Sequence, residues 1–422
     1  MTLKLFSLAI KSLRFRKFSV GLTIFSLAIS IMLLFGVDTI RVQTKSNFIN
    51  TISGTDLIVG SRSGSVQLLL YTVFHLGNAT NNVSWDNYQK IIRHPRVSWS
   101  IPISLGDSHK GYRVIGTSQD YFSYYSYHKN RFLEFSGGRQ FEDLFDVVIG
   151  ANVAKELGYS LGDEIILAHG MGNVSLAEHK NLPFVVSGIL EPTASPVDNN
   201  LFVSLAGLEA VHIGWEHGVA SKTDITTEDI NKDDPRLQVK SITAFFLGLK
   251  SKHDIFNLQR AINDYKREPL LAIIPGVALL ELWKILGVVE KVLLLIAGLV
   301  VVTGLLGMLA IILTNLNSRS REIAILRSVG ASPLAILFMM IIETELLVLA
   351  GIIIGLGFMY TSLLVFNPIL QDSIGLTIEL LPPSVFQWII LGCILLAGFI
   401  ISFIPAFSAY RRTLQDGLSI RS

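Results

Sequence analysis

The stretch NSRSREIAILRSVGAS, Asn317 to Ser332, carries three arginines and one glutamate between two strongly apolar segments. At 3.6 residues per turn, its apolar side chains share one helical arc of about 160°. These side chains are Ile323, Ile325, Leu326 and Val329. Glu322 lies inside this arc, and an apolar stripe that contains a carboxylate is typical of a surface that docks into a partner's groove. The alternative is a loop whose arginines only orient the chain in a membrane.

The apolar segments on either side predict membrane-spanning helices. Half of the 422 residues are hydrophobic and only 16% are charged. A helix crosses a hydrocarbon layer of about 30 Å with roughly 20 apolar residues. Four segments meet this requirement, at residues 18–37, 292–313, 336–365 and 388–404. Each is apolar on all sides, which is not typical of an amphipathic helix on a soluble core.

The distribution of basic residues predicts which parts face the cytoplasm. Residues 1–17 hold five basic residues and no acid, and the stretches 314–335 and 405–422 each carry three arginines. The stretch 366–387 contains neither Lys nor Arg. By the positive-inside rule, the stretches 1–17, 314–335 and 405–422 are cytoplasmic, so both termini lie on that side. Residues 1–17 form either an amphipathic helix in the membrane interface or an ordinary basic flank.

Residues 38–291 then form a large region on the far side of the membrane. Short β-branched runs bounded by turn residues predict strands in TDLIVGS, FDVVIGA, DEIILAH, LPFVVSGIL and NLFVSL. Helical stretches lie between them, such as 151–157 and 254–265, so we expect an α/β region in two lobes, with an inserted lobe at about 146–204. Helical stalks are predicted around 39–48 and from Pro275 onward into the second span. The lone cysteine, Cys393, lies in the fourth span, so this region has no disulfide.

Several functional classes find little support in the composition. A net charge of +2 gives no indication of a nucleic-acid partner. The chain has no GxxxxGK[ST] motif, so any nucleotide is hydrolysed by another chain. All nine histidines lie between His75 and His253, but no pair shows tight metal-ligand spacing. We therefore favour ordinary surface and core histidines and leave a metal site as an open alternative.

The opening stretch also carries a family resemblance. SRSREIAILRSVGAS resembles the signature of the FtsX-like permeases of ABC transporters, the group that includes MacB, LolC and LolE. In that family the stretch forms a coupling helix that contacts the ATPase subunit. The resemblance implies this contact at Arg319, Arg321, Glu322, Ile323, Leu326, Arg327 and Gly330.

Two further stretches resemble the same family. IPAFSAYRRTLQDGL is similar to its closing pattern, at Pro405, Ala406, Ala409 and Leu418. VIGANVAKELGYSLGDEIIL resembles the outer domain of MacB-type proteins, at Gly150, Ala154, Leu157, Gly162 and Asp163. The chain departs from the family at Asp416 and Gly417, where a Glu-Ala pair is usual, and this puts the contacts of the tail in doubt.

The resemblance implies an α-helical membrane domain of four transmembrane helices, with a large two-lobed α/β periplasmic domain between the first two. Such a chain is the non-enzymatic permease subunit of a bacterial type VII ABC transporter in the inner membrane. ATP and Mg are bound by a separate ATPase, and a second permease copy completes a homodimer. ATP-driven motion then passes to the periplasmic domain to export, extract or release a substrate. A periplasmic substrate protein or adaptor is one candidate partner.

Other functions stay open at this point. One is a non-transporting regulator of a periplasmic partner, as for the cell-division member of the family. Another is part of a metal- or haem-related transport system. A third is a sensor or membrane enzyme without an ATPase.

Two acids fall within the third span. An unpaired carboxylate in lipid costs several kcal/mol, so Glu343 and Glu345 are expected to face protein or to be protonated. Glu343 matches an acid that the family places before a glycine-rich run. Here Gly351 and Gly355 form a GxxxG pattern, which allows close helix approach. Glu343 is either a dimer or stalk contact that senses the coupling helix, or a residue that reaches the cytoplasmic interface.

Overall fold

The computed structural model divides the chain into two units, which are described separately. It describes residues 11–13, 16–49, 51–128, 130–169, 177–178, 181–213, 226–232, 234–318, 320–374 and 378–415. The membrane unit comprises residues 1–43, 287–369 and 378–422, and the α/β unit comprises residues 44–286 and 370–377. Predictions for Arg319, Leu418 and residues 1–10 concern positions outside the described residues.

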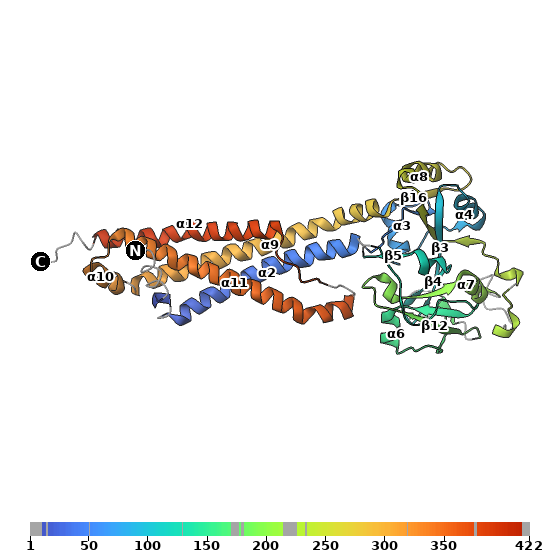
Figure 1. Ribbon diagram of the computed structural model, residues 1–422, viewed down its shortest axis with the longest axis horizontal. Helices are drawn as coiled ribbons and strands as arrows, with labels where there is room; N and C mark the ends of the chain where they lie inside the picture. Colours follow the sequence, from blue (N-terminus) through green and yellow to red (C-terminus); the bar gives the residue numbers. More distant parts are fainter. Residues whose placement is uncertain are drawn as a thin grey trace. The chain divides into compact units, whose positions relative to one another are not determined.

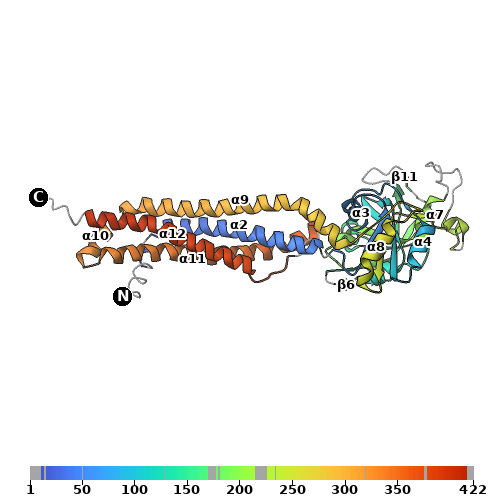
Figure 2. The same cartoon turned by 90° about the horizontal axis from the view of Figure 1, so that it is seen from above.

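The membrane unit is built from four long helices. These are α2 (Lys17–Ile49), α9 (Pro275–Ser318), α11 (Pro333–Ile374) and α12 (Val385–Gln415). All four contain stretches long and apolar enough to cross a membrane, which confirms the predicted fold class. Their backbone groups are paired within each helix, as a hydrocarbon environment requires. Both views show the four helices running side by side (Figures 1 and 2).

A short helix, α10 (Ser320–Ser328), connects α9 to α11. α9 is unbroken from Pro275 to Ser318, so the helix that contains the second span begins at the proline from which the sequence predicted a stalk. Proline is favoured at the first turn of a helix because its missing N–H would have no intrahelical partner.

The α/β unit is organised around one mixed sheet of 12 strands. Nine of them follow the order β16-β1-β15-β3-β4-β13-β8-β12-β7. Their bounds are β1 (Leu57–Ser61), β3 (Val97–His109), β4 (Tyr112–Thr117), β7 (Phe135–Gly138), β8 (Asp146–Ile149), β12 (Phe184–Leu190), β13 (Asn200–Ser204), β15 (Ala244–Leu249) and β16 (Leu270–Ile273). The remaining three are β9 (Glu164–Ile165), β10 (Ala168–His169) and β11 (Ala177–Glu178). Only the pairs β4–β13 and β8–β12 are parallel among the paired strands described.

The first and last strands of the sheet lie next to each other. β1 follows α2 and β16 precedes α9, and the two strands pair antiparallel from Ile58–Ile273 to Ser61–Leu270. The chain therefore enters and leaves this unit through neighbouring strands. About 240 residues are therefore inserted between two consecutive membrane helices, while the strands next in sequence to these helices remain neighbours in the sheet.

Helices and smaller strands cover the sheet. The helices are α3 (Ser65–Thr72), α4 (Trp85–Ile92), α5 (Asp120–Tyr124), α6 (Ala151–Leu157), α7 (Leu205–His212) and α8 (Ile255–Asn263). Two small sheets pair β2 (Val83–Ser84) with β14 (Ser241–Ile242) and β5 (Ser126–Tyr127) with β6 (Arg131–Phe132). α4 and α8 lie on the half that contains β16, whereas α6 and α7 lie on the half that contains β12 (Figure 1).

Each half has an apolar core of its own on one continuous sheet, and a third core is shared by both halves, since it includes Ile58 of β1 as well as Val148 of β8. One core, around β8, β12 and β13, includes buried residues from Val114 to Leu237. Its sequence range is wider than the 146–204 expected for the inserted lobe, because β4 pairs in parallel with β13 and brings Val114 into this core. Buried residues of β1, β15 and β16 form the other half together with α4 and α8.

Candidate functional site

The coupling stretch ends in a defined helix stop. The N–H of Ala331 donates to the carbonyl of Leu326 at 3.0 Å, and the N–H of Gly330 donates to the carbonyl of Arg327 at 2.9 Å. These two bonds form a Schellman motif, in which the residue after the helix adopts a left-handed conformation. Gly330 has φ +98°, a value that residues with a side chain rarely adopt. This conformation accounts for the glycine at this position.

The next residues start α11 immediately. Ser332 is the N-cap, and its Oγ accepts a hydrogen bond from the N–H of Ala335 at 3.2 Å. Pro333 occupies the first turn, where its fixed φ favours a helix. The sequence GASP thus closes one helix and opens the next within four residues.

The apolar arc of α10 has two sides. Ile323 is buried, with 8% exposure, against Ile336, Met340 and Ile341 of α11 and Ala406 of α12. Ile325 and Val329 are exposed to 63% and 83%. Ile323 therefore holds α10 on the membrane unit rather than lying on the exposed surface with the other apolar residues.

The other predicted contact residues flank these two sides. Glu322 is exposed, and Leu326 and Arg327 are half-buried. The backbone of Arg321 lies in α10, but its side chain, like the whole of Arg319, is outside the described residues. We name the exposed residues Glu322, Ile325 and Val329 the α10 outer face.

A buried ion pair lies close to this helix in the membrane unit. Nη2 of Arg16 is 3.0 Å from Oε1 of Glu343, and the two side chains are 19% and 7% exposed. The pair joins the start of α2 to α11, 327 positions away in sequence. Ser19, Thr23, Asn315 and Thr344 line a small cavity beside it. This contact was not predicted from the sequence, where Arg16 served only to orient the chain, although Arg16 and Lys17 are the two basic residues that immediately precede the first span.

The GxxxG glycines face α2 of the same chain. A Cβ on Gly351 would lie 2.7 Å from Cδ2 of Leu27, and a Cβ on Gly355 would lie 2.7 Å from the carbonyl oxygen of Ala28. Any side chain at these positions would force the helices apart. The two glycines thus allow α2 and α11 to pack closely within one chain.

A second polar cluster lies farther along α2. Arg41 is 3.2 Å from Asp38 and 3.0 Å from Glu290 of α9. The amide of Gln387 on α12 donates to Oδ2 of Asp38 at 2.9 Å. Gln43 also exchanges two hydrogen bonds with the backbone of Glu379.

Polar contacts therefore hold both ends of the apolar part of α2. Arg16 and Asp38 are 22 positions apart, which corresponds to about 33 Å along a helix and matches the thickness of the hydrocarbon layer. Between them, apolar side chains and glycine contacts such as Gly351 with Leu27 hold α2 in place. Movement of α11 or α9 relative to α2 must break one of these end contacts or carry α2 with it.

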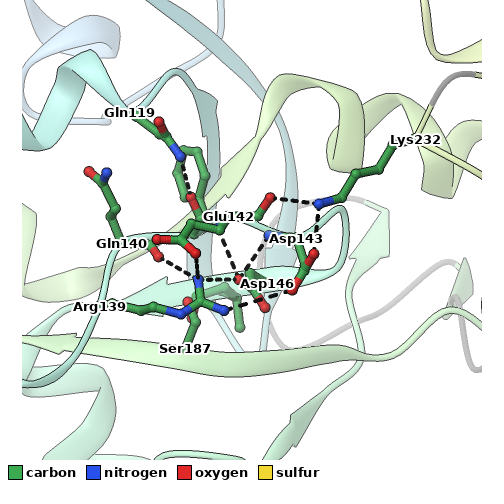
Figure 3. Close-up of polar contacts among 10 residues, drawn as sticks. Gln119, Arg139, Gln140, Glu142, Asp143, Asp146, Ser187 and Lys232 are labelled. Atoms are coloured by element: carbon green, nitrogen blue, oxygen red, sulfur yellow. Dashed lines mark hydrogen bonds and ion pairs between the residues drawn. The ribbon is translucent and has the colours of Figure 1, made fainter.

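The α/β unit contains an ionic cluster in the turn before β8 (Figure 3). Nη1 of Arg139 is 3.0 Å from Oδ2 of Asp146, which also accepts the backbone N–H groups of Glu142 and Asp143. Lys232 donates to Oδ1 of Asp143 at 2.6 Å and to the carbonyl of Glu142 at 3.0 Å. Charges of both signs are paired here, so the cluster closes a turn and is not an open binding site.

The described histidines do not form a metal site. Among the described residues, no three His, Cys, Asp or Glu side chains are placed to hold a metal ion. His109 contacts the carbonyl of Ile166 at 2.7 Å and the hydroxyl of Tyr159 at 2.9 Å. Burial, with the nearby Arg113 guanidinium, lowers the pKa of His75 to about 3. His75 is therefore a neutral core residue.

Comparison with known families now identifies the chain. A family model described as the MacB-like periplasmic core domain matches residues 20–264, more than half of the chain. A second, described as the FtsX-like permease C-terminal, matches residues 294–415. The chain belongs to the MacB/FtsX-type ABC-transporter permeases. The ABC permease family implies an ATPase partner.

Two solved structures are similar to the α/β part of this permease. The periplasmic region of MacB from Actinobacillus actinomycetemcomitans matches with 11% identity and a TM-score of 0.35, covering 56% of this chain and 95% of that structure. The extracellular domain of the noncanonic ABC-type transporter YknZ from Gram-positive bacteria matches with 12% identity and a TM-score of 0.29, covering 52% and 99%. No curated protein sequence matches this permease.

Proposed function

We propose that this permease transmits the motion of a cytoplasmic ATPase to its α/β unit, which then exports, extracts or releases a substrate. ATP and Mg are bound by the ATPase subunits, and two copies of the permease form a homodimer in the bacterial cytoplasmic membrane. The basic residues that flank the spans support a cytoplasmic position for both termini and for α10. The α/β units then lie on the periplasmic side.

The division of α10 into a buried side and an exposed side carries this proposal. The α10 outer face exposes Ile325 and Val329 beside Glu322, which suits a groove with an apolar floor and a basic rim. On the opposite side, Ile323 lies in one apolar cluster with residues of α11 and α12. A displacement of α10 is thereby passed to two membrane helices at once.

The Arg16–Glu343 ion pair provides the next step. Glu343 follows Met340, a member of the same apolar cluster as Ile323, by less than one helical turn. A shift of α11 therefore acts on Arg16 and on the start of α2. In the sequence, α2 is followed by β1, and β16 is followed directly by α9. Motion of these helices consequently reaches the two neighbouring strands through which the chain enters and leaves the α/β unit.

The docking step is tested by affinity purification of the full-length permease from its native membrane in mild detergent, with mass spectrometry of the proteins that accompany it. For the wild type we expect an ATPase subunit at roughly equal abundance. Val329→Asp places a charge on the α10 outer face and should reduce the recovered ATPase by about tenfold or more. Glu322→Arg, which reverses the charge there, should have a similar effect.

Two control variants separate docking from folding and from transmission. Phe256→Asp changes a residue that is 71% exposed on α8 of the α/β unit, and it should leave ATPase recovery unchanged. Ile323→Ala removes the buried contact but spares the α10 outer face, so the ATPase should still copurify while its turnover no longer responds to the permease. Full ATPase recovery with both Val329→Asp and Glu322→Arg would refute docking through this face.

A further inference from the structure

Glu345 differs from Glu343 although the two acids are only two residues apart on α11. Glu345 is half-buried, and its Oε1 is fully buried without a hydrogen-bond partner among the described residues. Helical geometry turns the two side chains about 160° apart. Glu343 points to Arg16, whereas Glu345 points to α12, where its Oε1 lies 3.5 Å from the position that a Cβ on Gly398 would occupy.

The apolar stretches of the other three long helices offer Glu345 no cation. The apolar stretches of α2 (18–37), α9 (292–318) and α12 (385–410) contain no charged residue. Arg16, which precedes α2, is engaged with Glu343. The first arginine of α12 is Arg411, about 20 Å along the helix from Gly398.

An ionised carboxylate in such surroundings loses its hydration and gains neither a counter-ion nor hydrogen bonds in return. The neutral acid avoids most of this cost. We propose that Glu345 binds a proton and that this protonated carboxyl is part of the packing between α11 and α12. The proton, not a metal or an organic ligand, is the species that the site holds.

The position of Glu345 connects this proton to the coupling helix. Glu345 follows Met340 and Ile341 by about one turn, and these residues belong to the same apolar cluster as Ile323. On the facing helix, Gly398 precedes Ala406, another residue of the same contact, by about two turns. Val348 packs against Gly398 beside Glu345, so α11 and α12 approach closely here. Loss of the proton would draw water to the carboxylate, separate the two helices and loosen the contact that holds α10.

The sign of the pH dependence follows directly. The closely packed arrangement binds the proton, so acid and neutral conditions favour it and alkaline conditions oppose it. On α11 the neighbouring acid Glu343 is paired with Arg16, and on the facing helix α12 the titratable group closest in sequence to Gly398 is Cys393. No histidine lies in any of the four spans, so no ordinary imidazole titration within them produces the same effect.

Dicyclohexylcarbodiimide provides the direct test, because it modifies carboxyls that are protonated and in apolar surroundings. Native membranes that contain the full-length complex are treated with it over a range of pH, and labelled peptides are measured by mass spectrometry. We expect Glu345 to react at least about tenfold more than Glu343, as a tenfold larger protonated fraction would give. Its labelling should fall at alkaline pH. Glu343 is the matched control on the same helix, and this readout does not depend on ATPase docking.

Glu345→Gln is the second test, since glutamine has the same shape and cannot ionise. The variant should assemble normally and should lose the alkaline decline in ATPase recovery that the wild type shows. Equal labelling of Glu343 and Glu345, or no labelling of Glu345 at any pH, would overturn the proposal. Resistance of Glu345 to labelling together with dissociation of the Glu345→Gln complex would instead assign it an ion pair with a partner subunit, which also overturns it.

Discussion

The α/β unit and the membrane unit satisfy their buried acids in different ways. In the α/β unit, the carboxylate of Asp198 accepts the backbone N–H groups of Thr193 and Ala194 and the hydroxyl of Thr193, all within five residues. In the membrane unit, Glu343 pairs with Arg16, 327 positions away. The reason is that loops leave N–H groups available, whereas transmembrane helices use theirs internally.

This difference has a consequence for function. An acid that is held by its own loop stabilises that loop and little else. An acid in a transmembrane helix needs a side chain from another helix, so its ion pair also determines how the two helices are arranged. The Arg16–Glu343 and Arg41–Glu290 contacts are of this second kind, and they join the helices whose relative motion the proposed mechanism requires.

The largest expected effect comes from breaking the first of these contacts. Arg16→Ala leaves Glu343 without its arginine, and removal of one partner of a buried ion pair typically costs about 3–5 kcal/mol. We expect a loss of that order in the free energy of unfolding of the membrane unit, measured for purified full-length protein by denaturant titration.

A charge exchange is the control for this prediction. Arg16→Glu combined with Glu343→Arg should recover a substantial part of the lost stability, since the pair is restored with its ends reversed. If Arg16→Ala is as stable as the wild type, Glu343 does not depend on a side chain from another part of the chain, and the contrast with the loop-held acids of the α/β unit is lost.

The sequence predicted the elements of this fold better than the contacts between them. Composition and length were sufficient for the four spans, and β-branched runs located β1, β8, β12 and β13. DEIILAH was expected to form one strand, but it forms two short ones, β9 and β10. β3 was not predicted because Pro102 and Gly106 interrupt its pattern. The structure accommodates this proline in a strand that pairs with β15 through Phe245.

The partners of the site residues could not be predicted from one sequence. GASP showed where α10 ends, because capping is local and depends on the residues themselves. The pairing of Glu343 with Arg16, by contrast, depends on which helices are neighbours and how each is rotated. The same holds for the apolar arc of α10, where packing against α11 and α12 selects Ile323 as the buried residue.

His75 tests the α/β side of the comparison with an effect of intermediate size. Its Nδ1 accepts a hydrogen bond from the amide of Asn200, 125 positions away, and its pKa is lowered to about 3 from an ordinary value of 6.5. Below pH 6.5 the unfolded chain therefore binds a proton that the folded unit excludes. Stability is complete above this pH and falls as the pH approaches 3, by about 2 kcal/mol at pH 5.

The measurement compares the unfolding free energy of the α/β unit at pH 7 and pH 5 in full-length wild type and His75→Asn. Asparagine tolerates the positive φ of 55° at this position and does not titrate. All other ionisable groups are common to both proteins, so the variant should be less sensitive to acid. Equal acid sensitivity would show that His75 is not the cause.

The smallest effect is expected at the exposed ionic cluster of Figure 3. Lys232 and Asp143 are 56% and 64% exposed, and an exposed ion pair contributes little to stability because water and salt screen it. Lys232→Ala should therefore change the stability of this turn only slightly. Asp146→Ala is the matched comparison, because it removes a buried acceptor of two backbone N–H groups and should cost several times more. Hydrogen exchange at β8 in the full-length protein measures both variants. A larger effect from Lys232→Ala than from Asp146→Ala would mean that the long-range charge, and not the local backbone contacts, holds this turn, which would remove the distinction between the two units.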